Sequence, residues 1–228
     1  MILNIYKPKD WTSNDVVQKI KKLGQFHKVG HAGTLDPLAE GVLLVLTDED
    51  TKKQGDLMEL TKVYKVKIAF GYESDSHDLG TPVKLVNKEK ADQLTREELS
   101  GALGKYIGEI TQQVPMYSAV HVGGTRLYQL ARAGKSETTP LPSKSIHISN
   151  IKLCDFKQQD RFDRFTAPTA TLEITCGKGT YIRSLVRDLG TDLDCGAVVI
   201  NLIRLAVGDY QINDSLTIED LAVNLIKS

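Results

Sequence analysis

Three side chains that can take part in acid–base or nucleophilic chemistry lie in one compact turn, GHAGTLDP (30–37), which begins the stretch GHAGTLDPLAEGVLLVL (30–46). They are His31, Thr34 and Asp36. The turn runs straight into GVLLVL (41–46), an apolar segment that is typical of a buried strand. A carboxylate fixed between a leucine and a proline at the edge of a core could serve as a nucleophile or base. It could equally accept hydrogen bonds from nearby backbone N–H groups as an ordinary turn residue.

Other motifs exclude several kinds of site. His27 and His31 are four residues apart, but Gly30 lies between them and works against a helical metal-binding pair. The sequence has no HExxH motif and no GxSxG nucleophile elbow, and GKGT (177–180) lacks the spacing of a Walker loop. The three cysteines are far apart and are predicted to be core thiols. We therefore expect no metal and no nucleotide site, and a loop histidine such as His31 is ordinarily solvated or bonded within its turn.

The composition is that of an ordinary globular protein. The chain has 228 residues, of which 41% are hydrophobic and 25% charged, and its formal net charge is +0. This length is enough to bury a sizeable core. The apolar runs are far shorter than a membrane span, and the N-terminal segment lacks the pattern of a secretory signal, so we expect a cytoplasmic protein. Neutral net charge argues against a polybasic tail but leaves room for a local basic face.

Helices are predicted from caps and apolar periodicity. Residues 12–24 have Thr12 or Ser13 as a cap, an apolar stripe, and Gly24 as a stop. A second helix begins at the capping box TREE (95–98).

A third helix, GTYIRSLVRDLG (179–190), is strongly amphipathic. Its apolar stripe predicts a buried face, and Gly190 is expected to end it. Arg183 and Arg187 are four residues apart and fall together on the other face. From the residues alone, Arg183 is therefore predicted to be a surface residue of this helix.

Strands are predicted where apolar residues alternate. In KVYKVKIAFG (62–71) the alternation places Tyr64 on the inner face at the beginning of the strand, where a core aromatic would also fit. Residues 146–156 and 170–176 are also predicted strands. Strands and helices alternate without a regular βαβ order, which favours an α+β fold with a mixed sheet.

Several separated segments resemble, in order, the motifs of the TruB family of tRNA pseudouridine synthases. They are NIYKPKDWTSNDVV (4–17), KVGHAGTLDPLAEGVLLVL (28–46), KVYKVKIAFGYESDSHDLG (62–80), QQVPMYSAVHVGGTRLYQLARAG (112–134), CGKGTYIRSLVRDLG (176–190) and CGAVVINLIRLAVGDY (195–210). The match begins at about Lys7 and continues to the end of the chain. Asp10 replaces the family's glycine in the first motif, and Met116 and His121 replace its usual proline and lysine in the fourth.

The resemblance implies the pseudouridine synthase fold, an α+β fold with a mixed, mostly antiparallel sheet flanked by helices. It implies one catalytic domain over residues 1–228 with a thumb loop inserted at about 112–145. Bacterial members usually carry a further C-terminal, PUA-like RNA-binding domain, and this sequence leaves no room for it. We expect a monomer that needs no cofactor, no metal, no membrane and no obligatory protein partner.

The resemblance also implies an activity, the isomerisation of uridine to pseudouridine at position 55 in the T-arm loop of tRNA. The target base is flipped out, its glycosidic bond is cut with the help of Asp36, and the base is rejoined through carbon. Attack at C1′, attack at C6 and a glycal route all remain open. The alternatives are a non-catalytic tRNA-folding chaperone and a guide-RNA-dependent synthase of the archaeal type that needs protein partners.

Residue roles follow from the matched motifs. Asp36 is implied as the nucleophile, Arg183 as its ionic partner, and Tyr64 as the ring that stacks on the target uracil. The other residues expected to bind substrate lie in the matched motifs or carry charge near them; they are His31, Asp78, Tyr181, Leu202, Lys7, Lys19, Arg126 and Arg132. Each lysine and arginine of this set, taken alone, could be just a solvated charge.

Overall fold

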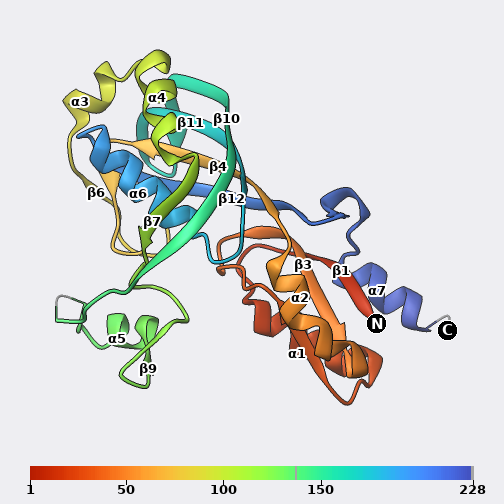
Figure 1. Cartoon of the computed structure of the whole chain (residues 1–228). Helices are drawn as coiled ribbons and strands as arrows, with labels where there is room; N and C mark the ends of the chain where they lie inside the picture. The colour runs from red at the N-terminus through yellow and green to blue at the C-terminus, as the bar shows by residue number, and fades with distance from the viewer. Residues whose placement is uncertain (137, 227–228) are drawn as a thin grey trace. The chain divides into compact units, whose positions relative to one another are not determined.

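The computed structural model describes residues 1–136 and 138–226, and Figure 1 shows its ribbon. The chain divides into two compact units. The first combines residues 1–65 with 201–228, and the second is the continuous segment 66–200. The expectation of one catalytic domain over residues 1–228 stays a prediction.

The first unit is built around strand β3 (Glu40–Thr47). β1 (Ile2–Lys7) and β2 (Val29–Ala32) both pair with it in antiparallel orientation. The later part of β12 pairs with it in parallel, with Ile203 opposite Glu40. β3 is buried along almost its whole length, which explains why its sequence is apolar throughout. The remaining elements of this unit, with the two strands that supply residues to both units, are α1 (Ser13–Gly24), η1 (Asp48–Lys53), α2 (Gln54–Glu59), β4 (Lys62–Phe70), β12 (Ala197–Val207), β13 (Tyr210–Gln211), η3 (Ile212–Asp214) and α7 (Ile218–Ile226).

Helix α1 confirms the prediction for residues 12–24. The Thr12 hydroxyl accepts a hydrogen bond from the Asp15 backbone N–H (3.1 Å), and the Asp15 carboxylate accepts one from the Thr12 N–H (2.8 Å). These two bonds satisfy donors that the first helical turn would otherwise leave unpaired. The helix ends at Gly24, and Gln25 takes the left-handed conformation (φ 52). The apolar face of α1 packs into a core cluster that it shares with strands and with α7, formed by Ile5, Val16, Ile20, Leu43, Val45, Ile218 and Leu221.

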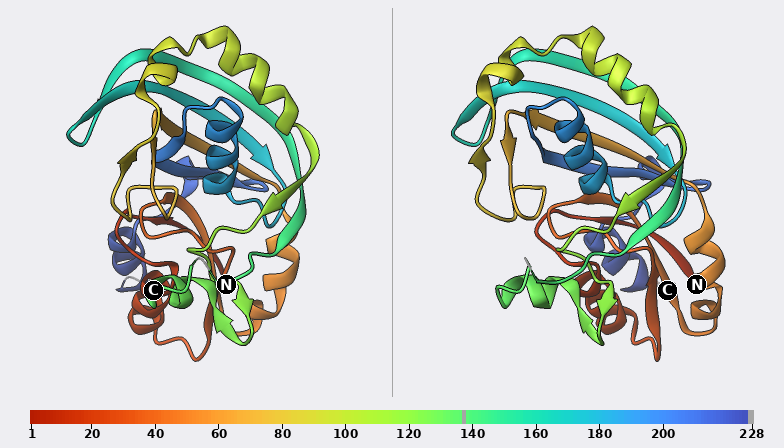
Figure 2. Two further views of the ribbon diagram at one scale, coloured as in Figure 1. Left: turned by 90° about the vertical axis from the view of Figure 1, so that its left-hand side faces the viewer. Right: turned by 60° about the vertical axis from the view of Figure 1, so that its left-hand side comes forward.

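The second unit is dominated by a long antiparallel hairpin. β10 (Ser143–Phe162) and β11 (Phe165–Cys176) pair along most of their length, and β7 (Gly108–Gln113) adds to the other edge of β10. The predicted strands at 146–156 and 170–176 are confirmed and lie within these longer strands. The hairpin is curved, and helix α6 lies on its concave side (Figure 2).

Helix α6 (Ile182–Asp192) confirms the predicted buried stripe but corrects two details. Gly190 does not end the helix, which continues to Asp192. Its role is packing, because a Cβ at this position would lie 2.3 Å from the backbone nitrogen of Ala197. The prediction that Arg183 lies on the surface was also wrong, since only 4% of this residue is exposed.

The predicted thumb segment (112–145) lies between β7 and β10, which pair at Gln113 and Ser143. It has an apolar cluster of its own, in which Val114 and Leu127 are fully buried. Figure 1 shows it in green, joined to the rest of the second unit by β7 and β10. The remaining elements of the second unit are β5 (Tyr72–Glu73), β6 (Lys84–Leu85), α3 (Lys88–Gln93), α4 (Arg96–Leu103), η2 (Gly104–Tyr106), β8 (His121–Val122), β9 (Thr125–Arg126) and α5 (Leu127–Arg132).

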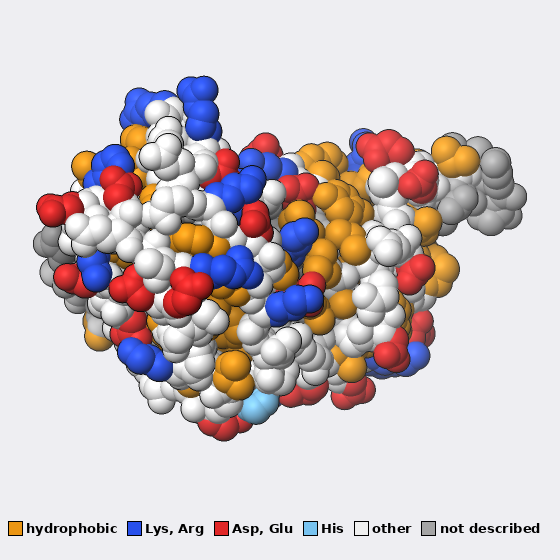
Figure 3. Space-filling view, turned by 90° about the horizontal axis from the view of Figure 1, so that it is seen from above, with side chains coloured by type: hydrophobic (Ala, Val, Ile, Leu, Met, Phe, Trp, Pro, Cys, Tyr) orange, Lys and Arg blue, Asp and Glu red, His pale blue; other side chains and the backbone are white. Residues whose placement is uncertain are grey.

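The surface carries charges of both signs. On the face shown in Figure 3, basic and acidic side chains are interspersed, in keeping with the formal net charge of +0. Among the helices that the structure describes, none is long and apolar enough to cross a bilayer.

Candidate active site

Asp36 lies half-buried in the loop between β2 and β3, and the residues beside it are fixed. Leu35 is buried, and its backbone is held twice by Ser13. The Ser13 hydroxyl accepts from the Leu35 N–H (2.9 Å) and donates to the Leu35 carbonyl (3.1 Å). The carbonyl of Asp36 itself accepts from the Ala39 N–H (3.1 Å). The loop is therefore tied to the start of α1 immediately before the carboxylate.

Pro37 fixes the loop on the other side of that carboxylate. Its carbonyl accepts hydrogen bonds from the Asp10 N–H (2.9 Å) and from the Lys7 ammonium (3.2 Å). Lys7 also donates to the carbonyls of Pro8 (2.8 Å) and Trp11 (2.6 Å). A reacting group held on both sides in this way needs little reorganisation before reaction, which is what preorganised catalysis requires.

Lys7 does not have the exposure that its predicted role in RNA binding calls for. The residue is fully buried, and its ammonium is engaged with three backbone carbonyls. Burial lowers the pKa of Lys7 to about 8, against the opposing pull of the Asp36 and Glu40 carboxylates. The structure places Lys7 beneath the loop, as a support for Pro37.

Asp10 has a positive φ of 67°, a conformation that costs an L-residue roughly 1 kcal/mol and costs glycine almost nothing. Asp10→Gly is therefore expected to raise the free energy of unfolding by up to about 1 kcal/mol. The N–H bond to Pro37 should survive, since it comes from the backbone. Equilibrium urea unfolding of the two proteins measures the difference.

Asp10→Ala is the matched control for this prediction. It removes the same exposed carboxylate but keeps a Cβ, so it should be less stable than the glycine variant. Equal losses of stability in both variants would show that the carboxylate matters here and the backbone conformation does not.

His31 lies on β2 beside a buried arginine that the sequence analysis missed. Arg204 is 1% exposed and donates from Nε to the Val42 carbonyl (2.7 Å). Burial lowers the pKa of His31, and the positive charge of Arg204 lowers it further. The buried Nδ1 of His31 has no hydrogen-bond partner among the described residues. The sequence did hold a signal, a lone arginine inside the apolar run INLIRLAV (200–207).

Tyr64 and Leu202 lie on adjacent strands of the sheet. The strand order runs β3, β12, β4, so the strand that follows the Asp36 loop, the strand of Leu202 and the strand of Tyr64 are neighbours. Tyr64 is 9% exposed and Leu202 is 7% exposed. The prediction that Tyr64 lies on the inner face is confirmed, and both side chains are buried in the first unit.

In the second unit, Arg183 and Asp78 come together. The Arg183 guanidinium donates to the carbonyls of Ser76 (2.7 Å) and Tyr117 (2.8 Å), and its Nε lies 3.6 Å from Asp78 Oδ2. Asp78 is 8% exposed and accepts from the Ser76 hydroxyl (2.5 Å) and the Gly80 N–H (2.9 Å). The guanidinium is therefore held rigidly by α6, by the loop after β5 and by the thumb segment.

His77, beside Asp78 in the second unit, is another residue that the sequence analysis missed. It precedes Asp78 in the chain with a positive φ of 62°, and its carbonyl accepts from the Val199 N–H (3.0 Å). Burial lowers the pKa of His77 to about 4, and the positive charges of Arg187 and Arg183 contribute. The imidazole is therefore neutral at physiological pH.

Tyr181 precedes α6 and is held by one glutamine of β7. The Gln112 side chain accepts from the Tyr181 N–H (2.8 Å) and donates to the Tyr181 carbonyl (3.1 Å). The Lys144 ammonium lies 5.9 Å from the centre of the tyrosine ring. This fixes the entry to α6, which has no side-chain cap of its own at its N-terminus.

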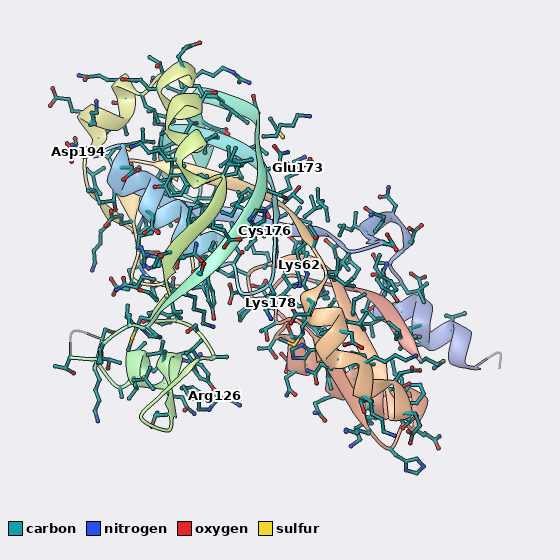
Figure 4. The ribbon with its side chains drawn as sticks, in the orientation of Figure 1. Lys62, Arg126, Glu173, Cys176, Lys178 and Asp194 are labelled. Atoms are coloured by element: carbon teal, nitrogen blue, oxygen red, sulfur yellow. The ribbon has the colours of Figure 1, made fainter. Side chains whose placement is uncertain are left out.

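The other predicted RNA contacts, Lys19, Arg126 and Arg132, are exposed. Arg126 and Arg132 belong to the thumb segment, where Figure 4 labels Arg126. Both lie against Tyr128. Arg126 donates to its hydroxyl (3.4 Å), and the Arg132 guanidinium lies 5.6 Å from its ring centre. Basic groups beside an aromatic ring suit RNA, and these contacts stay predictions.

Residues 21–182 match the family model described as TruB family pseudouridylate synthase (N terminal domain), and residues 183–227 match the model for the tRNA pseudouridylate synthase B C-terminal domain. The chain is 41% identical to tRNA pseudouridine synthase B of Bartonella henselae, over 97% of this chain and 66% of the relative. It is 40% identical to the protein of that name from Gloeothece citriformis, over 96% of this chain and 68% of the relative.

Solved structures show the fold. A chain in the crystal structure of a Cbf5-Nop10-Gar1 complex superposes with a TM-score of 0.69 at 24% identity, over 97% of this chain and 53% of that chain. The predicted α+β pseudouridine synthase fold, with its mostly antiparallel mixed sheet, is confirmed. This chain spans about two thirds of the length of the two curated relatives named above. The family model covers most of the chain, and the chain therefore belongs to the TruB family of pseudouridylate synthases.

Proposed function

We propose that this protein isomerises uridine to pseudouridine in tRNA, at position 55 in the T-arm loop. Family membership and the names of the relatives support the reaction and the tRNA substrate. The observation that carries the proposal is the loop of Asp36, whose flanking residues are bound by Ser13, Asp10 and Lys7. Two of these three residues, Ser13 and Lys7, are buried.

The reaction breaks the N1–C1′ bond, turns the uracil and forms a C5–C1′ bond, while C5 releases its proton and N1 takes one up. Atoms and electrons balance without any oxidant, reductant or second substrate. We propose that the reaction uses neither a cofactor nor a metal, as the family resemblance implies. We assign the Asp36 carboxylate to the first step, by attack at C1′, by attack at C6 or by promoting a glycal route. Each route needs this carboxylate ionised, and we assign Arg183 as its ionic partner during the reaction, as the matched motif implies.

Tyr64 and Leu202 form the proposed pocket for the base. Flipping a base out of its stack costs a few kcal/mol, and stacking on an aromatic ring returns roughly 1–3 kcal/mol per base. We assign the Tyr64 ring to one face of the uracil, its hydroxyl to proton transfer, and Leu202 to the other face. His31 takes the space that the flipped nucleotide leaves. Asp78 and Tyr181 position the elements around the nucleotide.

RNA recognition in this proposal depends on shape and backbone contacts. The exposed cations Lys19, Arg126 and Arg132 contact phosphates, with the thumb segment closing on the T-arm. The protein acts as a monomer on the folded T-arm, without an obligatory protein partner.

The test is an assay of the purified protein on bare RNA. An unmodified tRNA transcript and a pre-folded T-arm stem-loop, both labelled with tritium at uridine C5, are incubated in EDTA, and tritium release is measured. A transcript with cytidine at position 55 is the substrate control. We expect release from the first two RNAs and none from the control.

Each alternative predicts a different result. A non-catalytic tRNA-folding chaperone would release no tritium from any RNA while still binding tRNA. A guide-RNA-dependent synthase would become active only after guide RNA and partner proteins are added. Release that persists from the control transcript would contradict the assignment of position 55 but not the reaction.

A further inference from the structure

Arg204 is the largest fully buried side chain in the described part of the protein. It lies on β12, whose other residues in this region are mostly apolar. Burying a guanidinium is costly unless its N–H groups are hydrogen-bonded. The hydrogen bonds of the Arg204 side chain therefore indicate its role. Its side chain is too deep to contact RNA in this structure.

The guanidinium binds both ends of one chain segment. Nε donates to the carbonyl of Val42 (2.7 Å), and Nη2 donates to the carbonyl of Gly33 (3.1 Å). These two carbonyls enclose residues 33–42, the segment that carries Asp36. A single side chain therefore connects the point where the segment leaves β2 with the point where it has entered β3.

The backbone of Arg204 supports the same segment. Arg204 pairs in parallel register with Gly41, which has a positive φ of 100°. A Cβ at Gly41 would lie 2.3 Å from the Arg204 carbonyl oxygen. The backbones of β12 and β3 are therefore in close contact at this point, and this contact fixes the position from which the Arg204 side chain extends.

The positive charge also reaches the groups around Asp36. Arg204 lowers the pKa of Lys7 and of His31, which lie on β1 and β2. The negative charge of the Asp36 carboxylate acts in the opposite direction and raises the pKa of Lys7. Arg204 and Lys7 are therefore two buried cations that support one loop, Lys7 at Pro37 and Arg204 at its ends.

We propose that Arg204 is a positioning residue for the reaction, which ties the two ends of segment 33–42 together and so fixes the direction of the Asp36 carboxylate. This inference rests on the proposed function. The bond pattern requires the fork of an arginine, because a lysine ammonium at the end of a single stem cannot reproduce the paired geometry of Nε and Nη2.

The experiment compares Arg204→Lys and Arg204→Met with the wild type. Single-turnover tritium release at saturating enzyme gives the rate, and filter binding gives the Kd for the T-arm stem-loop. Hydrogen exchange followed by mass spectrometry reports on peptides that cover residues 33–42. We expect both variants to lose roughly 10²-fold in rate, as for a misplacement of about 1 Å, with Kd within a few-fold. Exchange should rise in 33–42 more than elsewhere in the first unit.

Leu221→Ala is the control for simple loss of stability. Leu221 is buried on α7 in the core cluster shared with α1, to which no residue of segment 33–42 belongs. This variant should lower the Tm and leave the rate at a temperature well below the Tm within a few-fold. If Arg204→Met fails to fold, Arg204→Lys decides, because it keeps the charge and the aliphatic stem.

Three results would overturn the proposal. They are a wild-type rate in Arg204→Lys, exchange that rises uniformly over the first unit, and an equal loss of rate in Leu221→Ala. If the wild-type protein made no pseudouridine, the proposed function would fail. The hydrogen-exchange measurement would still show whether Arg204 holds segment 33–42. Failure of the proposed function and failure of this inference are therefore distinguishable.

Discussion

Asp36→Asn is expected to abolish pseudouridine formation while leaving tRNA binding within a few-fold. Asparagine keeps the size of the side chain, and the bonds that hold Leu35 and Pro37 come from their own backbones. What is lost is the negative charge and the oxygen nucleophile, and loss of a nucleophile typically costs on the order of 10⁴-fold or more in rate. Single-turnover tritium release, filter binding and a thermal melt measure the three quantities.

Glu40→Gln is the matched control, since it makes the same chemical change four residues later. The Glu40 carboxylate accepts from the Tyr6 hydroxyl (2.7 Å), a bond that an amide oxygen can keep. Its rate should stay within a few-fold of the wild type. If Asp36 were just a turn residue, Asp36→Asn would lower the Tm and keep its activity, and near-normal product from folded protein would end the nucleophile assignment.

Arg183→Met is expected to reduce both stability and activity strongly. It leaves the carboxylate of Asp78 buried without its cation and leaves the carbonyls of Ser76 and Tyr117 without their donor. Breaking a buried ion pair on one side costs about 3–5 kcal/mol of unfolding free energy. The single-turnover rate should fall as well, because the proposed partner of Asp36 is lost. Urea unfolding and tritium release measure the two effects.

Two further variants test whether the loss of stability in Arg183→Met comes from the buried ion pair with Asp78. Adding Asp78→Asn to Arg183→Met should recover roughly 1–3 kcal/mol, since the unpaired charge is then removed. Arg187→Met changes an arginine one turn later, whose side chain is 18% exposed and pairs with its neighbour Asp188, and should cost less than Arg183→Met. Equal losses at both arginines, or no recovery in the double variant, would contradict a role for the buried pair.

Local patterns predicted the elements well. The capping box at Thr95 formed as expected, and Thr12, one of the two predicted caps of α1, forms a capping box with Asp15. Both depend on residues three positions apart. The alternation in β4 placed Tyr64 correctly, and the stripe of α6 is buried. These features depend on short-range geometry, which the order of residues contains directly.

Long-range packing could not be predicted in the same way. The burial of Lys7 depends on a carbonyl 30 residues away, and that of Arg183 on carbonyls 107 and 66 residues away. Gly190 looked like a helix stop because its packing against Ala197 is a tertiary contact. The catalytic role proposed for Asp36 came from the family resemblance, since the residue types alone also fit a turn.

The first unit is formed by two separate stretches of the chain, residues 1–65 and 201–228, and this has a consequence during protein synthesis. Val42 and Arg204 are 162 residues apart, and ribosomes add about 5–20 residues per second, so Arg204 follows Val42 by roughly 10–30 s. During this interval the nascent chain has β1, β2 and β3, but β3 still lacks the parallel neighbour that pairs at Glu40 and Gly41. An apolar strand with an open edge is prone to wrong pairing. The segment that carries Asp36 is therefore completed only after Arg204 has been synthesised, and the edge of β3 stays open until then.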